Sequence, residues 1–347
     1  MERKLASIQR VLAIEPIPNA DAIELARING WQCVVKKNEF QVGSLGVFLE
    51  IDSVPPDTQT FDFLWQPKPK EGEPLPDKIE RPASFRIRTM KLRGMLSQGL
   101  LLPLNQFGLN EASEGDDVTE TLSVTKYDPP LPFARDELRA MFPGYVPKTD
   151  EMRVQSVPQV LDEMRGLPYV MTLKCDGTSS TFCIHPRDWN EFHVCGRNYS
   201  LKDGDNFYWN IARQYEIEEI LRRAPHLAIQ GEICGPGIQR NRLALKALTL
   251  FVFNVYDIKT ARYLDDAEMR RFCADNNLTP VAIVEQGDSF EYSMDELLAR
   301  AEGKYDNTSN EREGVVIRPT TERRSEILAG RLSFKTISNR FLLKEGD

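Results

Sequence analysis

The sequence lacks paired cysteines, a long hydrophobic run and an excess of positive charge. Its six cysteines include no Cys-x-x-Cys pair, which argues against a zinc ribbon and is typical of free thiols in a reducing compartment. No apolar run is long enough to cross a bilayer. The net charge of −8 excludes a polybasic binder, so any contact with nucleic acid must come from local basic patches.

Histidine is also scarce, and the three that occur, His185, His193 and His226, form no metal-ligand pattern. The N-terminus has no signal-peptide pattern, so we expect an intracellular, cytoplasmic protein, with the nucleus left open, without a membrane association and without an obligate protein partner. A length of 347 residues with 41% hydrophobic residues allows two domains with ordinary cores.

The first hundred residues have the pattern of many short strands separated by Pro-Asn, Asn-Gly, Val-Gly and Pro-Pro turns, which is typical of a small closed barrel. The predicted strands are Ser7 to Glu15, Ile23 to Ala26, Gln32 to Lys36, Gly46 to Ile51, Phe85 to Lys91 and Gly99 to Leu102.

Three stretches of this region carry a resemblance to a known module. They are Ile17-Pro-Asn-Ala-Asp21, Val42-Gly-Ser-Leu-Gly-Val-Phe-Leu-Glu50 and Lys91-Leu-Arg-Gly-Met-Leu-Ser97-Gln98-Gly99. They resemble the OB module at the N-terminus of some RNA ligases and, more distantly, tRNA-binding OB domains. The resemblance implies an OB-fold nucleic-acid-binding domain over residues 1–120.

Basic residues cluster in this module, within thirteen residues that include no acidic side chain. Alternate residues of a strand share a face, so Arg86 and Arg88 are placed to follow successive phosphates. The alternative is a solvated basic strand that guards a sheet edge. We favour nucleic acid, with Arg81 as a neighbour and with these candidate contacts: Arg86, Arg88, Lys91 and Arg93. Three aromatic residues could stack on bases or belong to the core: Trp31, Phe85 and Tyr127.

The periodicity fades after Leu104, and Asp128-Pro-Pro-Leu-Pro132 stiffens a connection. We therefore expect a linker over residues 121–144 and a second domain over 145–347. Its pattern is mixed α+β. The predicted helices are Ser156 to Arg165, Phe207 to Arg223, Asp265 to Ala274 and one that starts with the capping box Ser293-Met-Asp-Glu296. The predicted strands are Leu227 to Ile233, Leu248 to Ile258, Pro280 to Val284 and Gly314 to Arg318.

Near the middle of the chain, small and β-branched residues flank Lys174-Cys-Asp176-Gly177. Asp-Gly between two such runs predicts a β-hairpin whose tip presents Lys174 and Asp176. Alone, this short pattern is equally consistent with a solvated surface lysine. Cys175 points to the opposite strand face, and we expect it to serve packing.

Further motifs follow in a fixed order. They are Cys195-Gly-Arg197-Asn198, Gln230-Gly-Glu232, Phe251-Val-Phe253, Glu311-Arg-Glu313-Gly314 and Ser333-Phe-Lys335. With Lys174, they resemble the motif series of the covalent nucleotidyltransferase superfamily of polynucleotide ligases and capping enzymes. The resemblance implies a nucleotidyltransferase domain of antiparallel sheets with flanking helices, with ATP and Mg²⁺ or Mn²⁺ as cofactors.

The resemblance also implies a role for each residue. Lys174 would attack the α-phosphorus of ATP, which requires a neighbour that lowers its pKa, and Lys335 would clamp the α-phosphate. Carboxylates would hold the metal ion, mostly through water: Asp176, Glu232 and Glu313. The remaining nucleotide contacts would be adenine stacking by Phe253 (with Phe251 as the alternative) and polar contacts from Arg153, Arg197 and Asn198. Taken singly, each of these residues also suits an ordinary structural position.

One position departs from the superfamily pattern, since Ser333 stands where the last motif commonly has a first lysine. Arg331 could replace that charge. The chain ends at Asp347 without the OB domain that follows the last motif in DNA ligases and capping enzymes. An OB module before Lys174 resembles instead the fifth family of RNA ligases, which implies joining of 3′-OH and 5′-phosphate ends of RNA or RNA-containing duplexes at nicks. The alternatives are a capping guanylyltransferase, a small DNA ligase, or an RNA-binding protein with a silent domain.

Overall fold

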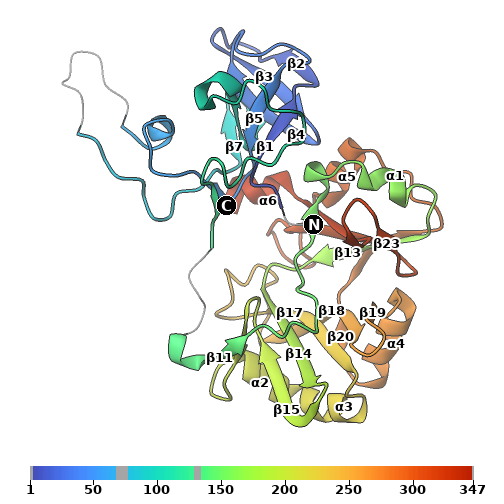
Figure 1. The fold of residues 1–347 in the computed structure, drawn as a ribbon. Coiled ribbons are helices and arrows are strands. Elements are labelled where there is room, and N and C mark those ends of the chain that lie inside the picture. The colour runs from blue at the N-terminus through green and yellow to red at the C-terminus, as the bar shows by residue number, and fades with distance from the viewer. Residues whose placement is uncertain (1–2, 68–76, 129–133, 346–347) are drawn as a thin grey trace. The chain divides into compact units, whose positions relative to one another are not determined.

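The computed structural model describes residues 3–67, 77–128 and 134–345. The chain divides into two compact units (Figure 1): unit 1 comprises residues 1–129 and 342–347, and unit 2 comprises residues 130–341. The division falls within the segment expected to be a linker, whose prolines 129, 130 and 132 lie outside the described residues. In the described ranges, no helix is both long and apolar enough to span a membrane.

Unit 1 consists of short antiparallel strands in two three-stranded sheets, ordered β1-β5-β9 and β2-β3-β4, and two pairs, β7-β8 and β10-β6. The strands are β1 (Ala6–Arg10), β2 (Ala13–Pro16), β3 (Ile23–Ile28), β4 (Trp31–Lys36), β5 (Leu45–Leu49), β6 (Ser53–Val54), β7 (Met90–Leu92), β8 (Met95–Ser97), β9 (Leu100–Pro103) and β10 (Thr125–Lys126). Two 3₁₀ turns, η1 (Asp62–Leu64) and η2 (Leu104–Phe107), complete the unit.

Two expectations for unit 1 need revision. The strand predicted from Phe85 to Lys91 begins only at Met90, because Ile87 exchanges single backbone hydrogen bonds with Asp52 and Ser53 and no ladder extends from them. The strand predicted from Ser7 to Glu15 is two strands in different sheets. Backbone partners far along the chain decide both outcomes.

Unit 2 is built on two sheets. The larger has the order β11-β16-β15-β14-β17-β18-β19 with β20 also paired to β18, and the smaller has the order β12-β25-β22-β13-β21. The strands of the larger sheet are β11 (Leu138–Met141), β14 (Thr178–His185), β15 (Asp188–Cys195), β16 (Tyr199–Leu201), β17 (Leu227–Cys234), β18 (Thr249–Asp257), β19 (Arg262–Tyr263) and β20 (Thr279–Pro280). Those of the smaller sheet are β12 (Met152–Arg153), β13 (Tyr169–Lys174), β21 (Ile283–Gly287), β22 (Gly314–Pro319) and β25 (Phe334–Ile337).

Helices flank these sheets, and most pairings are antiparallel, so the predicted α+β class is confirmed. The helices of unit 2 are α1 (Val160–Met164), α2 (Phe207–Gln214), α3 (Ile217–Arg223), α4 (Asp266–Asp275) and α5 (Met294–Ala301). The division between the units falls within α6 (Asn339–Glu345). The remaining short elements are η3 (Arg135–Glu137), η4 (Val154–Ser156), β23 (Arg324–Ser325) and β24 (Gly330–Arg331).

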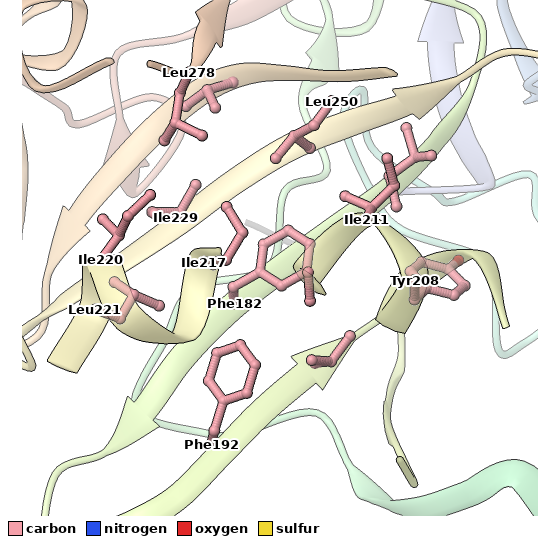
Figure 2. Close-up of a cluster of buried hydrophobic side chains, with 14 of the residues drawn as sticks. Phe182, Phe192, Tyr208, Ile211, Ile217, Ile220, Leu221, Ile229, Leu250 and Leu278 are labelled. Carbon is pink, nitrogen blue, oxygen red and sulfur yellow. The ribbon is translucent and has the colours of Figure 1, made fainter. Parts of the chain in front are cut away.

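The main core of unit 2 lies between the larger sheet and helices α2 and α3. Figure 2 shows Phe182 and Phe192 from the strands facing Ile217 and Leu221 from α3. Phe182 is fully buried, as are both of those helix side chains. Burial of each such side chain stabilises the fold by about 1.5–3 kcal/mol, so this cluster fixes the larger sheet, on which Glu232 and Phe253 lie.

The predicted hairpin at Lys174 does not form. Lys174 ends β13 in the smaller sheet, whereas Thr178 begins β14 in the larger sheet, and the two strands do not pair with each other. Strand β13 pairs with β21 and β22, and β14 pairs with β15 and β17. Cys175–Gly177 is therefore a crossing between sheets, since each strand finds two partners elsewhere and these override the local turn signal.

Two predicted helices are shorter than expected. The segment from Phe207 to Arg223 is two helices because Glu216 adopts the left-handed conformation, with φ of +49°. The helix expected from Ser156 begins at Val160, because the residue before Pro158 is disfavoured in the α conformation. The capping box at Ser293 is confirmed, and the Ser293 hydroxyl accepts a hydrogen bond from the Glu296 amide.

This cap gives a first prediction. Ser293→Ala removes the acceptor for an orphan amide of α5, so the free energy of unfolding should fall by about 1 kcal/mol. Urea unfolding followed by circular dichroism measures it. Ser289→Ala, at an exposed serine outside the helix, should change stability by less than about 0.5 kcal/mol. Equal effects of the two substitutions would contradict the capping role.

Candidate active site

Gly177 allows the segment that crosses between the two sheets after Lys174 to approach strand β17 closely. A Cβ atom at this position would lie 2.4 Å from the carbonyl oxygen of Ile233 and 2.8 Å from Cγ of Glu232. Only glycine fits in that space. The Gly177 amide also donates to the carboxylate of Glu232. Close backbone approach thus places Lys174 and Asp176 beside Glu232, although they belong to different sheets.

Lys174 makes an ion pair with Glu313, the residue that immediately precedes β22. Nζ lies 2.7 Å from Oε1, and both side chains are about one-fifth exposed. Burial by itself would lower the pKa of Lys174, but the charges of Glu313 and then Glu232 outweigh it and raise the pKa. The expected lowering of this pKa is therefore not found in the protein alone, because the neighbours of the amine are carboxylates.

Three carboxylates surround the amine: Asp176, Glu232 and Glu313. Burial, followed by repulsion from Glu313 and Asp176, raises the pKa of Glu232 to about 8 although Lys174 opposes the shift. Burial and the charge of Glu313 likewise raise the pKa of Asp176, against the effect of Arg242. The raised pKa values show that these carboxylates are buried close to one another, and a divalent cation would relieve their mutual repulsion.

The carboxylates do not form a direct metal cage. In the described part of the chain, no three His, Cys, Asp or Glu side chains are arranged to hold an ion together. A hard ion such as Mg²⁺ keeps several of its waters and is bound through few carboxylates. The donor set therefore suits a hydrated ion, with carboxylate oxygens that accept hydrogen bonds from its waters.

Lys335 and Arg153 supply positive charge near Lys174. Lys335 pairs in register with Val316 of β22 and with Arg153 of the parallel strand β12. Burial, followed by repulsion from Lys174 and Arg153, lowers the pKa of Lys335 to about 7. A phosphate bound beside Lys335 would reduce the repulsion among Lys335, Lys174 and Arg153. Its binding next to the charged form of Lys335 is therefore favourable.

Arg331, considered as a replacement for the lysine missing from the last motif, has a carboxylate partner in the protein. Its guanidinium pairs with Glu322, and Nε donates to a carboxylate oxygen at 2.7 Å. It also lies over the ring of Tyr263, 4.2 Å from the centroid. Ser333 itself donates to Glu151 at 2.8 Å. The charge of Arg331 is therefore already matched, and Lys335 is the lysine that this motif contributes.

Phe251 and Phe253 lie on one face of β18, both partly buried, against an apolar cluster that includes Cys175 and Cys234. Phe251 is directly opposite Glu232, and the register of the β17–β18 ladder shifts just beyond, between Gln230 and Gly231. Cys175 is buried in this cluster, in keeping with the packing role expected of it. Stacking of Phe253 on adenine remains a prediction.

Arg197 and Asn198 contact the segment before β12. Arg197 pairs with Asp150, with Nη2 2.7 Å from Oδ1, and is 42% exposed. The side-chain oxygen of Asn198 accepts a hydrogen bond from Lys148 at 3.0 Å. Neither Lys148 nor Asp150 has a local signal in the sequence that marks it as part of the site. The electrostatic effect of Asp150 on Lys335 links this polar pair to the lysine site.

Comparison with known proteins agrees with this geometry. A family model described as an OB-fold domain matches residues 5–104, and one described as RNA ligase matches residues 167–337. A solved structure of a Naegleria gruberi RNA ligase mutant with ATP and Mn is 37% identical, covers 98% of both chains and has a TM-score of 0.84. The chain belongs to the RNA ligase family.

Other structures of the Naegleria gruberi RNA ligase are similarly close. A mutant with AMP and Mn is 36% identical, with a TM-score of 0.84, and a structure with PPi is 36% identical, with a TM-score of 0.83. Each covers 98% of this chain and 98% of the other chain. The comparison with curated proteins found no match. The expected OB-fold domain followed by a ligase domain is confirmed.

The OB-fold domain of this RNA ligase presents three of the four predicted basic contacts to solvent: Arg88, Lys91 and Arg93. Arg93 lies in the turn between β7 and β8, with φ of +47°. Arg86 differs, since it lies over the ring of Tyr127 at 4.3 Å and close to Asp52. Two of the three aromatic residues considered for base stacking serve the core: Trp31 is buried, and Phe85 packs edge-on against Trp65.

Two side chains at the ligase site have no signal in the sequence. Arg242, in the loop between β17 and β18, makes an ion pair with Asp176, and both side chains are about one-tenth exposed. Tyr305, in the loop before β22, donates a hydrogen bond to the carbonyl oxygen of Lys174 at 3.1 Å. Both come from loops without regular periodicity, so only the folded chain identifies them.

The close approach at Gly177 gives a second prediction. Gly177→Ala should lower RNA ligation by about a hundredfold, since displacement of reacting groups by about 1 Å has that effect. Overpacking should also lower the free energy of unfolding by about 1–3 kcal/mol. A ligation assay and urea unfolding measure both. Gly144→Ala, where a Cβ meets nothing within 4 Å, serves as the control. Full activity of Gly177→Ala would show that the spacing of β17 is not required.

Proposed function

We propose that this RNA ligase joins 3′-OH and 5′-phosphate ends, at nicks in duplexes that contain RNA, at the expense of ATP. The observation that carries the proposal is that groups of both charges lie near Lys174. The carboxylate of Glu313 is 2.7 Å from its amine. Lys335 lies close enough to interact electrostatically with both Lys174 and Arg153. An amine in this setting can meet a phosphate whose charge is neutralised by nearby cations.

The chemistry divides into three steps. Nζ of Lys174 loses its proton and attacks the α-phosphorus of ATP, so a nitrogen–phosphorus bond forms while the bond to pyrophosphate breaks. A 5′-phosphate oxygen of RNA then attacks the same phosphorus and releases the lysine, which leaves an adenylylated 5′-end. Finally the 3′-OH attacks the 5′-phosphate, the phosphodiester forms and AMP leaves.

The surrounding residues support these steps by position and charge. Lys335 and Arg153 would contact the α-phosphate, with Arg197 and Asn198 at the ribose or the nick phosphate and Phe253 on adenine. Asp176, Glu232 and Glu313 would hold Mg²⁺ or Mn²⁺, which supplies positive charge to the phosphate oxygens when it is bound. Structures of the related ligase contain ATP with Mn and AMP with Mn, which supports this assignment.

Labelling of the protein tests the first step. Incubation with radiolabelled ATP and Mg²⁺ or Mn²⁺ should give a covalent AMP adduct on a denaturing gel, and Lys174→Arg should abolish it, because a guanidinium stays protonated. Lys202→Arg, at an exposed lysine of the same unit, should label normally. Labelling from GTP instead would indicate a guanylyltransferase. Absence of any adduct in the unmodified protein would indicate an RNA-binding protein without this activity.

Sealing assays test the role of the OB-fold domain. Substitution of the exposed Lys91 and Arg93 by alanine should leave adduct formation unchanged but weaken sealing of RNA nicks about tenfold. It should also reduce the slope of log affinity against log salt by about 1.5, as expected for two lost phosphate contacts. Alanine at Lys36 and Lys37, two exposed lysines of the same unit, should have little effect. Equal losses in both double variants would contradict a specific basic surface.

The choice of substrate is tested with nicks that carry single ribonucleotides. We expect sealing when the 3′-OH belongs to a ribonucleotide and little sealing of an all-DNA nick. Efficient sealing of all-DNA nicks would assign the chain to DNA joining instead.

A further inference from the structure

The hydroxyl group of Tyr305 contacts the backbone of three residues at the site of the proposed nucleophile, Lys174. It donates to the carbonyl oxygen of Lys174 at 3.1 Å, and it accepts from the amide of Asp176 at 3.0 Å and from the amide of Glu313 at 3.2 Å. Tyr305 is 3% exposed. One hydroxyl thus links three residues of the site through their main chains.

The hydroxyl lies where the ladder between β13 and β22 ends. The last pair in register is Lys174 with Gly314. Beyond it the chain after Lys174 crosses to the larger sheet, so the amides of Asp176 and Glu313 have no strand partner opposite them. A hydroxyl oxygen has one donor and two acceptor sites. The Tyr305 hydroxyl uses all three hydrogen-bonding sites. It therefore provides hydrogen bonds that a pairing strand would otherwise make.

The loop that carries Tyr305 also holds the partner of Asp176. The Tyr305 amide donates to the carbonyl oxygen of Asn310 at 3.1 Å, and the Asn310 side chain donates to the carbonyl oxygen of Arg242 at 2.8 Å. Arg242 in turn pairs with the carboxylate of Asp176. The loop therefore fixes Asp176 twice, through its own amide and through its ionic partner.

We propose that Tyr305 is a positioning residue that sets the separation of Lys174 and Glu313 and the orientation of Asp176 for the formation of lysyl-AMP. The inference rests on the proposed function of Lys174. Tyr305 acts through hydrogen bonds to the backbone, and it touches neither the amine nor the carboxylates. Its effect should therefore fall on the rate of the chemical step and not on the affinity for nucleotide.

The test is Tyr305→Phe in the full chain. Phenylalanine keeps the ring in its buried site but leaves two amides and one carbonyl group to find new partners, which shifts the backbone around the lysine. At saturating ATP and metal ion, adduct formation should slow by about 10- to 100-fold. The ATP concentration for half-maximal rate should change by less than about twofold, because the nucleotide contacts are intact.

Tyr169→Phe is the matched control. Tyr169 is 4% exposed and begins β13, the strand that ends at Lys174. Its hydroxyl donates a hydrogen bond to Glu285. The control should label at the rate of the unmodified protein, with a loss of thermal stability similar to that of Tyr305→Phe. Equal labelling rates in the two variants, fast or slow, would overturn the inference. So would a rise in the half-maximal ATP concentration with the saturating rate retained.

Hydrogen exchange of the unmodified protein gives a second test that needs no variant. The amides of Asp176 and Glu313 should exchange slowly, as buried hydrogen-bonded groups do. Fast exchange at both would overturn the inference even if Tyr305→Phe failed to fold. Failure of the proposed function is separate, since it would appear as absence of an AMP adduct in the unmodified protein.

Discussion

The chain after Lys174 crosses from one sheet of unit 2 to the other with Gly177 in contact with the backbone of β17. Since Lys174 ends a strand of the smaller sheet and Glu232 lies in the larger one, this contact is what brings them together. Glu313 immediately precedes β22, the strand of the smaller sheet that pairs with β13. The site therefore exists only where the two sheets meet, and its geometry follows from how closely the crossing can approach β17.

Charge is arranged around that crossing in two opposed groups. Carboxylates raise the pKa of Lys174, whereas burial and the neighbouring cations lower the pKa of Lys335 to about 7. The two lysines therefore have opposite electrostatic environments within one site. A phosphate near both lysines would reduce the repulsion between Lys335 and its cationic neighbours. A divalent cation among the carboxylates would offset the negative charges that raise the pKa of Lys174. Each ligand would create the conditions in which the other is effective.

Lys174, Glu232 and Lys335 could be selected from the sequence only through the resemblance to an ordered series of motifs, since each residue taken alone suits an ordinary structural position. The sequence could not predict the crossing at Gly177, since an Asp-Gly pair has the same local signal in a hairpin. Strand pairing with partners more than a hundred residues away decided the outcome. The break at Glu216 and the contacts of Arg242 and Tyr305 escaped prediction for the same reason, because each depends on what the rest of the chain places nearby.

Arg331, the residue considered as a replacement for the charge missing at Ser333, belongs to a group of contacts around β18. Arg318 of β22 donates to the carbonyl oxygen of Phe253 and to Asn254 of β18, each at 2.9 Å. Arg331 donates to the same Asn254 oxygen. Arg318 therefore links the smaller sheet, and Arg331 links the β23–β24 pair, to the strand that carries the predicted adenine-stacking ring. An arginine committed to that link, with Glu322 as its counterion, has no charge left for a phosphate. Removal of one partner of such a buried pair is strongly destabilising, so we expect substitution of Arg331 to affect the stability of this link first.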